Sequence, residues 1–184
     1  MFQRQILIFA LTATISMACL PAFAEKETAQ KGVSADATVL ASPEITYKAL
    51  RSMRDEDPSG CRVLSSSENE SVVEEVFDGL PVIGKAVCVY RETYEPQKRI
   101  SFKMIRSDKL KAFEGEWTLQ AVDNGTHTQV RLQSYIDSGI KVPFAKQITE
   151  MANSGEIKQQ VADLKKSAEH KQKQVAAKNS NASI

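Results

Sequence analysis

The sequence predicts an α+β fold in which a curved antiparallel β-sheet wraps around one long C-terminal helix. Between residues 62 and 137, apolar and polar side chains alternate in successive short runs, the pattern of strands with one covered and one wet face. From Pro143 to about Lys171 the apolar residues recur every three or four positions, which is helical spacing. Such a helix would be roughly 40 Å long at 1.5 Å per residue, enough to lie across the whole sheet.

The first 24 residues have the order of a secretory signal peptide. A single basic residue, Arg4, precedes an apolar stretch from Ile6 to Leu20, and a proline and two small residues follow it. Because spanning a bilayer takes about 20 apolar residues, this stretch is too short for an anchor, and we expect cleavage after Ala24. The alternative is a lipid-modified N-terminus at Cys19, although Ser16 stands where a lipobox takes a leucine-like residue.

The rest of the chain has the length and charge of one domain. We expect a flexible linker over residues 25–35, a folded domain over 36–171 and a disordered tail over 172–184. The chain carries 24 basic and 23 acidic residues with no basic block in its centre, which argues against nucleic acid as a partner. No later segment is apolar enough to cross a membrane. We therefore expect a periplasmic or secreted monomer that contacts a membrane surface at most transiently.

A short strand and a helix open the domain. The strand is predicted over residues 37–41. After it, Ser42-Pro43-Glu44 supplies a capping hydroxyl, a proline in the first turn and an acid near the positive end of a helix. Apolar residues at helical spacing then give this helix one buried face, and it ends before Gly60.

Six strands follow, separated by turn signals. The clearest of these signals is Asp123-Asn124-Gly125, a typical hairpin sequence. The best alternation is found in Phe113, Gly115, Trp117 and Leu119, which share one face. The predicted strands are residues 62–67, 71–78, 84–94, 99–106, 110–122 and 126–137.

Two cysteines remain after the leader, Cys61 and Cys88. An isolated pair in an oxidising compartment is a candidate disulfide. The predicted order places them on strands that are not adjacent, however, and a disulfide needs Cα atoms within about 7 Å. The other interpretation, two small buried apolar side chains, stays open.

The order of these elements resembles the helix-grip fold of the START-like (SRPBCC) superfamily. This superfamily includes polyketide cyclases, coenzyme Q-binding proteins, lipid-transfer domains and plant pathogenesis-related allergens. The resemblance runs from about Val33 to Lys171, and two features depart from it: a short segment after the first helix and the presence of a signal peptide. The motifs that carry it are Ala41-Ser42-Pro43-Glu44, Phe113-Glu114-Gly115-Glu116-Trp117, the Asn124-Gly125-Thr126 hairpin with Thr128 and Val130 beyond it, and Pro143 at the start of the last helix.

The resemblance implies a cavity between the sheet and the last helix that holds a sterol, lipid, quinone or polyketide-like molecule. Each residue implied to line it has the alternative role of ordinary core packing. Trp117 would either pack under the helix or form a cavity wall with its N–H as a polar group. The implied ligand-binding residues are Phe102, Met104, Phe113, Trp117, Leu119, Val130, Leu132, Phe144, Ile148 and Met151.

Catalytic residues are not evident in the sequence. The two histidines, His127 and His170, fall beside a hairpin and in a charged helix end, so we expect both to face solvent. The chain has no metal-ligand spacing of His and Cys, no Gly-x-Ser-x-Gly motif and no phosphate-binding glycine-rich loop, so we expect neither a metal nor another cofactor. Glu75, Arg91 or Arg106 would support acid–base chemistry only if one pointed into the cavity.

Three functional hypotheses follow. The first is a non-catalytic carrier or sensor of an apolar molecule, and the second is a cyclase or related lyase acting on a polyketide-like substrate. The second requires at least two converging polar groups in the cavity. The third is an interaction module whose cavity has filled in. The first is preferred because the inward positions of the best strands are nearly all apolar.

Overall fold

The computed structural model describes residues 32–53, 60–81, 83–141 and 143–181. The expected signal peptide, the alternative lipidation site at Cys19 and most of the expected linker lie outside these residues. No helix within the described ranges is long and apolar enough to span a membrane. The elements are β1 (Val33–Val39), α1 (Pro43–Met53), β2 (Cys61–Ser66), β3 (Glu70–Leu80), β4 (Gly84–Glu95), β5 (Arg99–Ser107), β6 (Ala112–Val122), the 3-10 turn η2 (Asp123–Gly125), β7 (His127–Asp137) and α2 (Ala145–Asn181).

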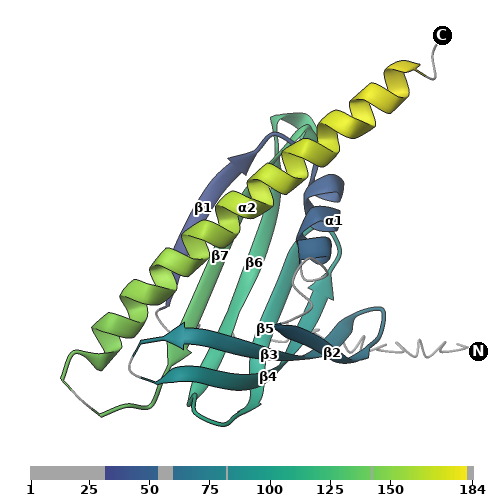
Figure 1. Cartoon of the computed structure of the whole chain (residues 1–184). Helices are drawn as coiled ribbons and strands as arrows, with labels where there is room; N and C mark the ends of the chain where they lie inside the picture. Colours follow the sequence, from purple (N-terminus) through teal and green to yellow (C-terminus); the bar gives the residue numbers. More distant parts are fainter. Residues whose placement is uncertain (1–31, 54–59, 82, 142, 182–184) are drawn as a thin grey trace, which may run out of the picture.

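The strands form one seven-stranded sheet in the order β1-β7-β6-β5-β4-β3-β2. Every pair is antiparallel, so β2 to β7 make a meander and β1 adds to its far edge beside β7. Helix α2 crosses one face of this sheet (Figure 1). In the lower part of the same view, β3 and β4 run crosswise to β6 and β7. The predicted α+β helix-grip fold is therefore confirmed.

The β6–β7 hairpin is tight because its turn accepts a left-handed backbone. Asp123 and Asn124 have φ values of 49° and 56°, and Gly125 has 82°. Asparagine, aspartate and glycine tolerate this region better than other residues. The turn sets the register in which Trp117 lies opposite Leu132, so both side chains face the helix side of the sheet.

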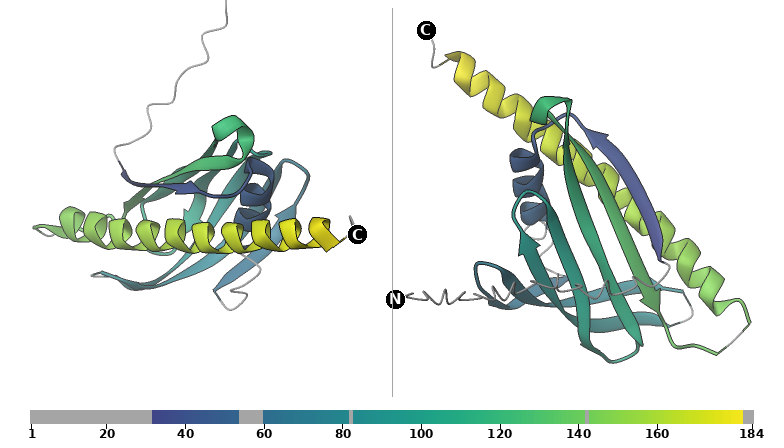
Figure 2. Two further views of the ribbon diagram at one scale, coloured as in Figure 1. Left: turned by 90° about the horizontal axis from the view of Figure 1, so that it is seen from above. Right: turned by 180° about the vertical axis from the view of Figure 1, so that it is seen from behind.

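Helix α1 is fixed to the sheet by a buried hydroxyl network. The hydroxyl of Thr128 on β7 donates to the carbonyl oxygen of Ala41 at 2.8 Å, and the Thr46 hydroxyl lies 3.2 Å from that of Thr128. All three groups are buried, where an unsatisfied polar atom would be costly. Figure 2 shows α1 beside the C-terminal half of α2, and the backbone N–H of Ser42 donates to the side chain of Gln172 at 3.3 Å.

The buried apolar residues form two clusters. The larger lies between α1, α2 and the β1, β6 and β7 strands, and contains Trp117 and Leu164. The smaller lies under β3 and β4 and contains Tyr90 and Phe113. Phe102 packs against both clusters, so it marks the boundary between them.

Two expected boundaries need correction. The domain does not start after a linker ending at residue 35, because Val33 and Ser34 already pair with β7 in strand β1. The helix does not end near Lys171, and residues 172–181 of the expected disordered tail continue it to Asn181. This segment is rich in Gln, Lys and Ala, which have high helix propensity, so it extends the helix without needing an apolar face.

Candidate functional site

A cavity of about 100 Å³ lies between the sheet and α2, at the boundary of the two apolar clusters. Five strands and the first half of α2 contribute to its wall. The lining residues are Glu75, Tyr90, Glu92, Phe102, Phe113, Trp117, Leu132, Ser134, Asn153, Ile157 and Gln160.

Aromatic rings form one side of the cavity. The rings of Phe102 and Phe113 stack with centroids 4.9 Å apart, and Tyr90 meets the Phe113 ring edge-on at 5.3 Å. The Phe102 ring reaches this position because it passes over Gly115, where a Cβ atom would lie 2.5 Å from the ring. The glycine in β6 therefore shapes the cavity wall.

Two carboxylates also face the cavity. On β3 the alternation that turns Val73 inward brings Glu75 to the same side, and on β4 it brings Glu92 inward between Tyr90 and Tyr94. The Tyr90 hydroxyl donates to Glu75 at 2.7 Å, and the Tyr94 hydroxyl donates to Glu92 at 2.8 Å. Glu92 is only 5% exposed. Buried carboxylates need such donors, because each lost hydrogen bond would leave an expensive desolvated oxygen.

The helix side of the cavity is polar as well as apolar. Asn153 on α2 and Ser134 on β7 are both buried, and the Asn153 side-chain amide donates to the Ser134 carbonyl oxygen at 3.3 Å. The Ser134 hydroxyl in turn lies 3.3 Å from the Asn153 amide oxygen. This pair attaches the first turns of α2 to the sheet through hydrogen bonds, whereas the apolar contact of the helix with the sheet begins at Ile157.

The structure brings together four of the ten residues that the resemblance implied for the site. Phe102, Phe113, Trp117 and Leu132 line the cavity. Met104 packs on the smaller cluster, and Leu119 and Val130 are buried in the larger one. The other three, Phe144, Ile148 and Met151, are 71%, 41% and 74% exposed and point away from the cavity.

The outward placement of Ile148 and Met151 follows from helix geometry, whereas Phe144 lies just before the start of α2. Successive residues of an α-helix are turned by about 100°, so Met151 and Ile148 lie roughly 120° and 180° around the axis from Ile157. Ile157 faces the sheet, together with Val161 and Leu164. In the first turns the inward positions are instead taken by Ala145, Thr149 and Asn153.

Only part of the polar lining of the cavity was predicted from the sequence. Glu75 does reach the cavity, but Arg91 and Arg106 lie on the outer face, where they form ion pairs with Glu70 at 3.8 Å and Glu74 at 4.0 Å. The sequence interpretation missed Tyr90, Glu92, Ser134, Asn153, Ile157 and Gln160 as lining residues. Glu92 lies midway between two tyrosines, but apolar residues occur at both parities of β4, so the sequence alone gave no clear signal for it.

Cys61 and Cys88, the two cysteines in the described part of the chain, do not form a disulfide with each other. Cys61 on β2 and Cys88 on β4 both lie opposite Glu75 on the intervening strand β3, as expected for non-adjacent strands. Burial, with a smaller contribution from the nearby carboxylates Glu75 and Asp108, raises the pKa of the Cys88 thiol to about 12. Cys88 is therefore a neutral apolar side chain at physiological pH.

Neither of the two histidines lines the cavity. His127 lies near the surface with Nδ1 2.7 Å from Asp123, and His170 is exposed with Nε2 2.8 Å from Gln174. Within the described part of the chain, no three His, Cys, Asp or Glu side chains gather closely enough to hold a metal ion.

A second hollow, more open and about 330 Å³ in volume, lies between α1 and β2. Arg51 lines it and places its guanidinium 3.7 Å from the centre of the Tyr94 ring. Burial raises the pKa of the neighbouring Tyr47. Lys48 and Arg51 make part of this hollow basic, whereas no lysine, arginine or histidine is among the described residues that line the cavity under α2.

Comparison with solved structures finds the same fold at low sequence identity. A protein from Thermus thermophilus is 16% identical with a TM-score of 0.61, covering 74% of this chain and 95% of that one. The Zhui aromatase/cyclase from Streptomyces sp. R1128 is also 16% identical, with a TM-score of 0.60 and coverage of 74% and 92%. The di-domain ARO/CYC StfQ of the steffimycin biosynthetic pathway is 14% identical, with a TM-score of 0.53 and coverage of 77% and 46%.

Comparison with curated protein sequences finds no match. The pattern of one protein family, described as polyketide cyclase / dehydrase and lipid transport, matches residues 30–169. This is a group that the START-like resemblance had named. Because the match covers well over half of the 184 residues, the chain belongs to the polyketide cyclase/dehydrase and lipid transport family.

Proposed function

We propose that this protein is an exported, monomeric carrier or sensor that binds a small, largely apolar molecule in the cavity between the sheet and α2. The observation that supports it best is the cavity itself, where aromatic and aliphatic walls meet a few polar groups. Ligand sites typically combine apolar walls with a few polar groups that fix orientation. The signal-peptide pattern at the N-terminus supports export to the periplasm or the medium.

The size of the cavity limits its ligand. Sites for drug-sized molecules usually measure roughly 300–1,000 Å³, which exceeds the 100 Å³ found here. A compact ligand fits directly, whereas a larger one requires the first half of α2 to move away from the sheet. The first turns of that half are held by Ala145, Thr149 and Asn153 rather than by large apolar side chains, so displacing these turns alone exposes little apolar surface.

The proposal is tested by native mass spectrometry of protein purified from its host envelope, followed by organic extraction of any bound molecule. We expect a stoichiometric small molecule on the wild-type protein. Leu132→Phe should lose it, because the larger ring fills the cavity next to Trp117. The matched control Ile105→Phe, on the exposed outer face, should keep it.

Circular dichroism melting of both variants separates loss of ligand from loss of folding. Overpacking a core costs about 1–3 kcal/mol, which a domain of this size should survive. Protein that is empty in all three forms and shows no response to added apolar compounds would argue against the carrier function.

A second candidate function is an enzyme of the cyclase or dehydratase kind. It is favoured by Glu75 and Glu92, since such a reaction needs at least two polar groups in the cavity. One solved structure of the same fold is named an aromatase/cyclase. Turnover of a polyketide-like substrate by the wild-type protein, lost in Glu92→Gln, would favour this function over the carrier.

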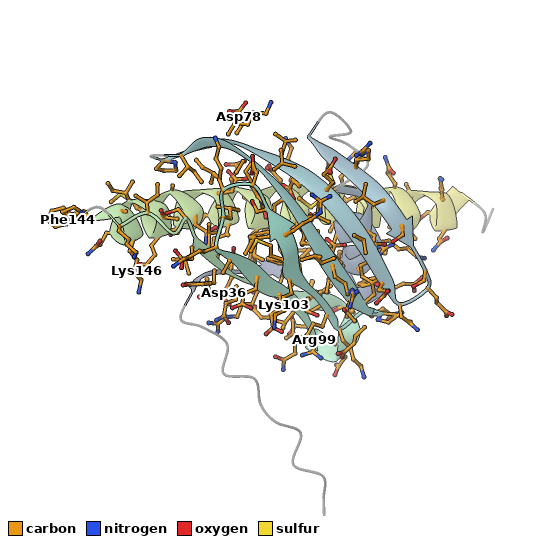
Figure 3. The ribbon with its side chains drawn as sticks, turned by 90° about the horizontal axis from the view of Figure 1, so that it is seen from below. Asp36, Asp78, Arg99, Lys103, Phe144 and Lys146 are labelled. Carbon is orange, nitrogen blue, oxygen red and sulfur yellow. The ribbon has the colours of Figure 1, made fainter. Side chains whose placement is uncertain are left out.

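We further propose that the start of α2 meets an anionic membrane surface. Phe144, Ile148 and Met151, here called the outer stripe, form an exposed apolar face, and Lys141 and Lys146 are exposed beside it. Figure 3 shows Phe144 and Lys146 pointing away from the body of the molecule at the same end. Lys146 also lies 3.8 Å from Glu150, which offsets part of its charge. Apolar side chains flanked by lysines suit the interface of a bilayer with anionic lipids.

The double variant Phe144→Ser/Met151→Ser is expected to bind anionic phospholipid vesicles at least tenfold more weakly in a sedimentation assay. Burying one large apolar side chain contributes about 1.5–3 kcal/mol, and 1.4 kcal/mol corresponds to a factor of ten. The control Leu40→Ser/Val175→Ser removes exposed apolar residues elsewhere and should bind like wild type. Equal binding by both double variants would contradict the docking role of the outer stripe.

A further inference from the structure

The hollow between α1 and β2 borders a guanidinium whose hydrogen-bonding capacity is incompletely used. Nη1 of Arg51 is buried, and it has no hydrogen-bond partner in the part of the chain that the structure describes. The guanidinium lies over the ring of Tyr94, with its central carbon 3.7 Å from the ring centre. Such stacking attracts the positive charge but supplies no acceptor for the N–H groups, which lie in the plane of the guanidinium. Because a buried charge without a hydrogen-bonded partner is costly, an anion beside Arg51 would stabilise it.

Two lysines add positive charge around this hollow. Lys48 lines it one turn before Arg51, and Nζ of Lys171 on α2 donates to the hydroxyl of Ser52, another lining residue. Lys48 lies 2.6 Å from Glu44, which offsets part of its charge. Arg51 and Lys171, in contrast, form no ion pair with any residue that the structure describes. At least two of the three cations therefore lack a counter-charge of their own.

The strand side of the hollow is neutral and can donate a hydrogen bond. Ser66 on β2 and Ser71 on β3 line it, with their hydroxyl oxygens 2.9 Å apart. In such a pair one hydroxyl donates to the other, and the proton of the second hydroxyl remains available for a ligand. Glu68 and Glu70, near the turn between the two strands, are exposed and do not line the hollow, and Glu70 lies 3.8 Å from Arg91.

The end of α2 extends the positive field. Helix α1 lies beside the C-terminal half of α2 (Figure 2). From residue 171 to residue 181, this half contains three lysines and no aspartate or glutamate. Charges of one sign around a recess raise the local concentration of ligands of the opposite sign. The hollow is thus placed to attract an anion.

We propose that this hollow binds a phosphate group, either as free phosphate or as part of a phosphorylated small molecule. Guanidinium and ammonium groups hydrogen-bond strongly to phosphate oxygens, and a dianion matches two unpaired cations better than a carboxylate does. The volume of about 330 Å³ leaves room for an organic body, for which Tyr47 and Val63 supply apolar wall. The hollow shares no lining residue with the cavity under α2, so the proposal goes beyond the carrier function and does not depend on it.

The test compares phenyl phosphate, benzoate and phenol by isothermal titration calorimetry at constant ionic strength. At about pH 8, above the second pKa of a phosphate ester near 6, these compounds share an aromatic ring and carry two, one and no negative charges. We expect phenyl phosphate to bind at least tenfold more tightly than benzoate, and phenol to bind most weakly. Benzoate or phenol binding as tightly as phenyl phosphate, or no binding of phenyl phosphate, would overturn the proposal.

Inorganic phosphate distinguishes the two sources of the phosphate group. Binding as tight as that of phenyl phosphate would identify free phosphate as the ligand. Binding at least tenfold weaker would identify a phosphorylated organic molecule, whose body contacts the apolar part of the wall.

Variants locate the phosphate site. Arg51→Gln and Lys171→Gln each remove one positive charge and should weaken binding of phenyl phosphate at least tenfold, as expected for the loss of a charged hydrogen bond. The control Arg62→Gln removes the same charge from β2. The Arg62 side chain is 71% exposed, lies 2.7 Å from Glu74 and does not line the hollow, so this variant should bind like wild type.

Circular dichroism melting without phosphate shows whether each variant is folded. Should Arg51→Gln fail to fold because Tyr94 loses its stacking partner, Lys171→Gln decides the test, since Lys171 contacts the wall of the hollow through the hydroxyl of Ser52. Unchanged binding in folded Lys171→Gln and Arg51→Gln, or an equal loss in Arg62→Gln, would overturn the proposal. Leu132→Phe, which fills the cavity under α2, should still bind phenyl phosphate, so the failure of one proposal is distinguishable from the failure of the other.

Discussion

Leu164→Ala is expected to lower the free energy of unfolding by about 2–5 kcal/mol, the range found for buried leucines replaced by alanine. Leu164 is fully buried in the middle of α2 and belongs to the cluster that joins the helix to the sheet. Its removal takes apolar surface out of the interface and leaves a void that a sheet on one side and a helix on the other cannot close completely.

The control for this prediction is Val175→Ala on the same helix. Val175 is exposed beyond the sheet, so its truncation should change stability by less than about 0.5 kcal/mol. Urea unfolding followed by circular dichroism measures both values. A loss below about 1 kcal/mol at Leu164, or similar losses at both positions, would contradict the packing of α2 on the sheet.

The fold was predictable because its signals are local. The alternation through Phe113 and Trp117 fixes which face of β6 is covered, and the Asp-Asn-Gly turn fixes where the chain reverses into β7. Once the order of elements is known, an antiparallel meander with one long helix has few alternatives. The predicted ends of the elements were less accurate. Helix α2, for example, continues to Asn181 through residues of high helix propensity that need no apolar face.

On the helix side of the site, the sequence analysis assigned the wrong face of the first turns of α2 to the cavity. Phe144, Ile148 and Met151 are spaced as one apolar stripe, and Ile157, Val161 and Leu164 as another. The gap of six positions between Met151 and Ile157 puts the two stripes on different faces of a continuous helix. The inward side chains of the first turns are small or polar, so hydrophobicity gave no indication of them.

The acidic lining of the cavity could not be predicted from the sequence, because strand β4 is irregular. In β4, Val89 and Tyr90 are both buried, and the register with β5 shifts at that point. Apolar residues therefore occur at both parities of β4, and the sequence does not decide whether Glu92 faces in or out. Only the paired strands settle it, and they place Glu92 beside the cavity.

Gly115→Ala is expected to destabilise the fold by about 3 kcal/mol, near the upper end of overpacking effects. A Cβ at this position would lie 2.2 Å from the carbonyl oxygen of Gln133 on β7 and 2.5 Å from the ring of Phe102. The β7 backbone cannot give way without straining the β6–β7 pairing, while the ring can move only toward the cavity. The substitution should therefore also weaken binding of a compact ligand, because Phe102 would occupy part of its space.

The matched control is Gly155→Ala in α2. Nothing lies within 4 Å of the Cβ that it would add, so only the change in helix propensity remains, and stability should rise by up to about 1 kcal/mol. Chemical unfolding of the two variants should give shifts of opposite sign. If both substitutions raised the free energy of unfolding, β6 and β7 would have room for a Cβ at Gly115. The contact between Gly115 and the Phe102 ring would then not shape the cavity.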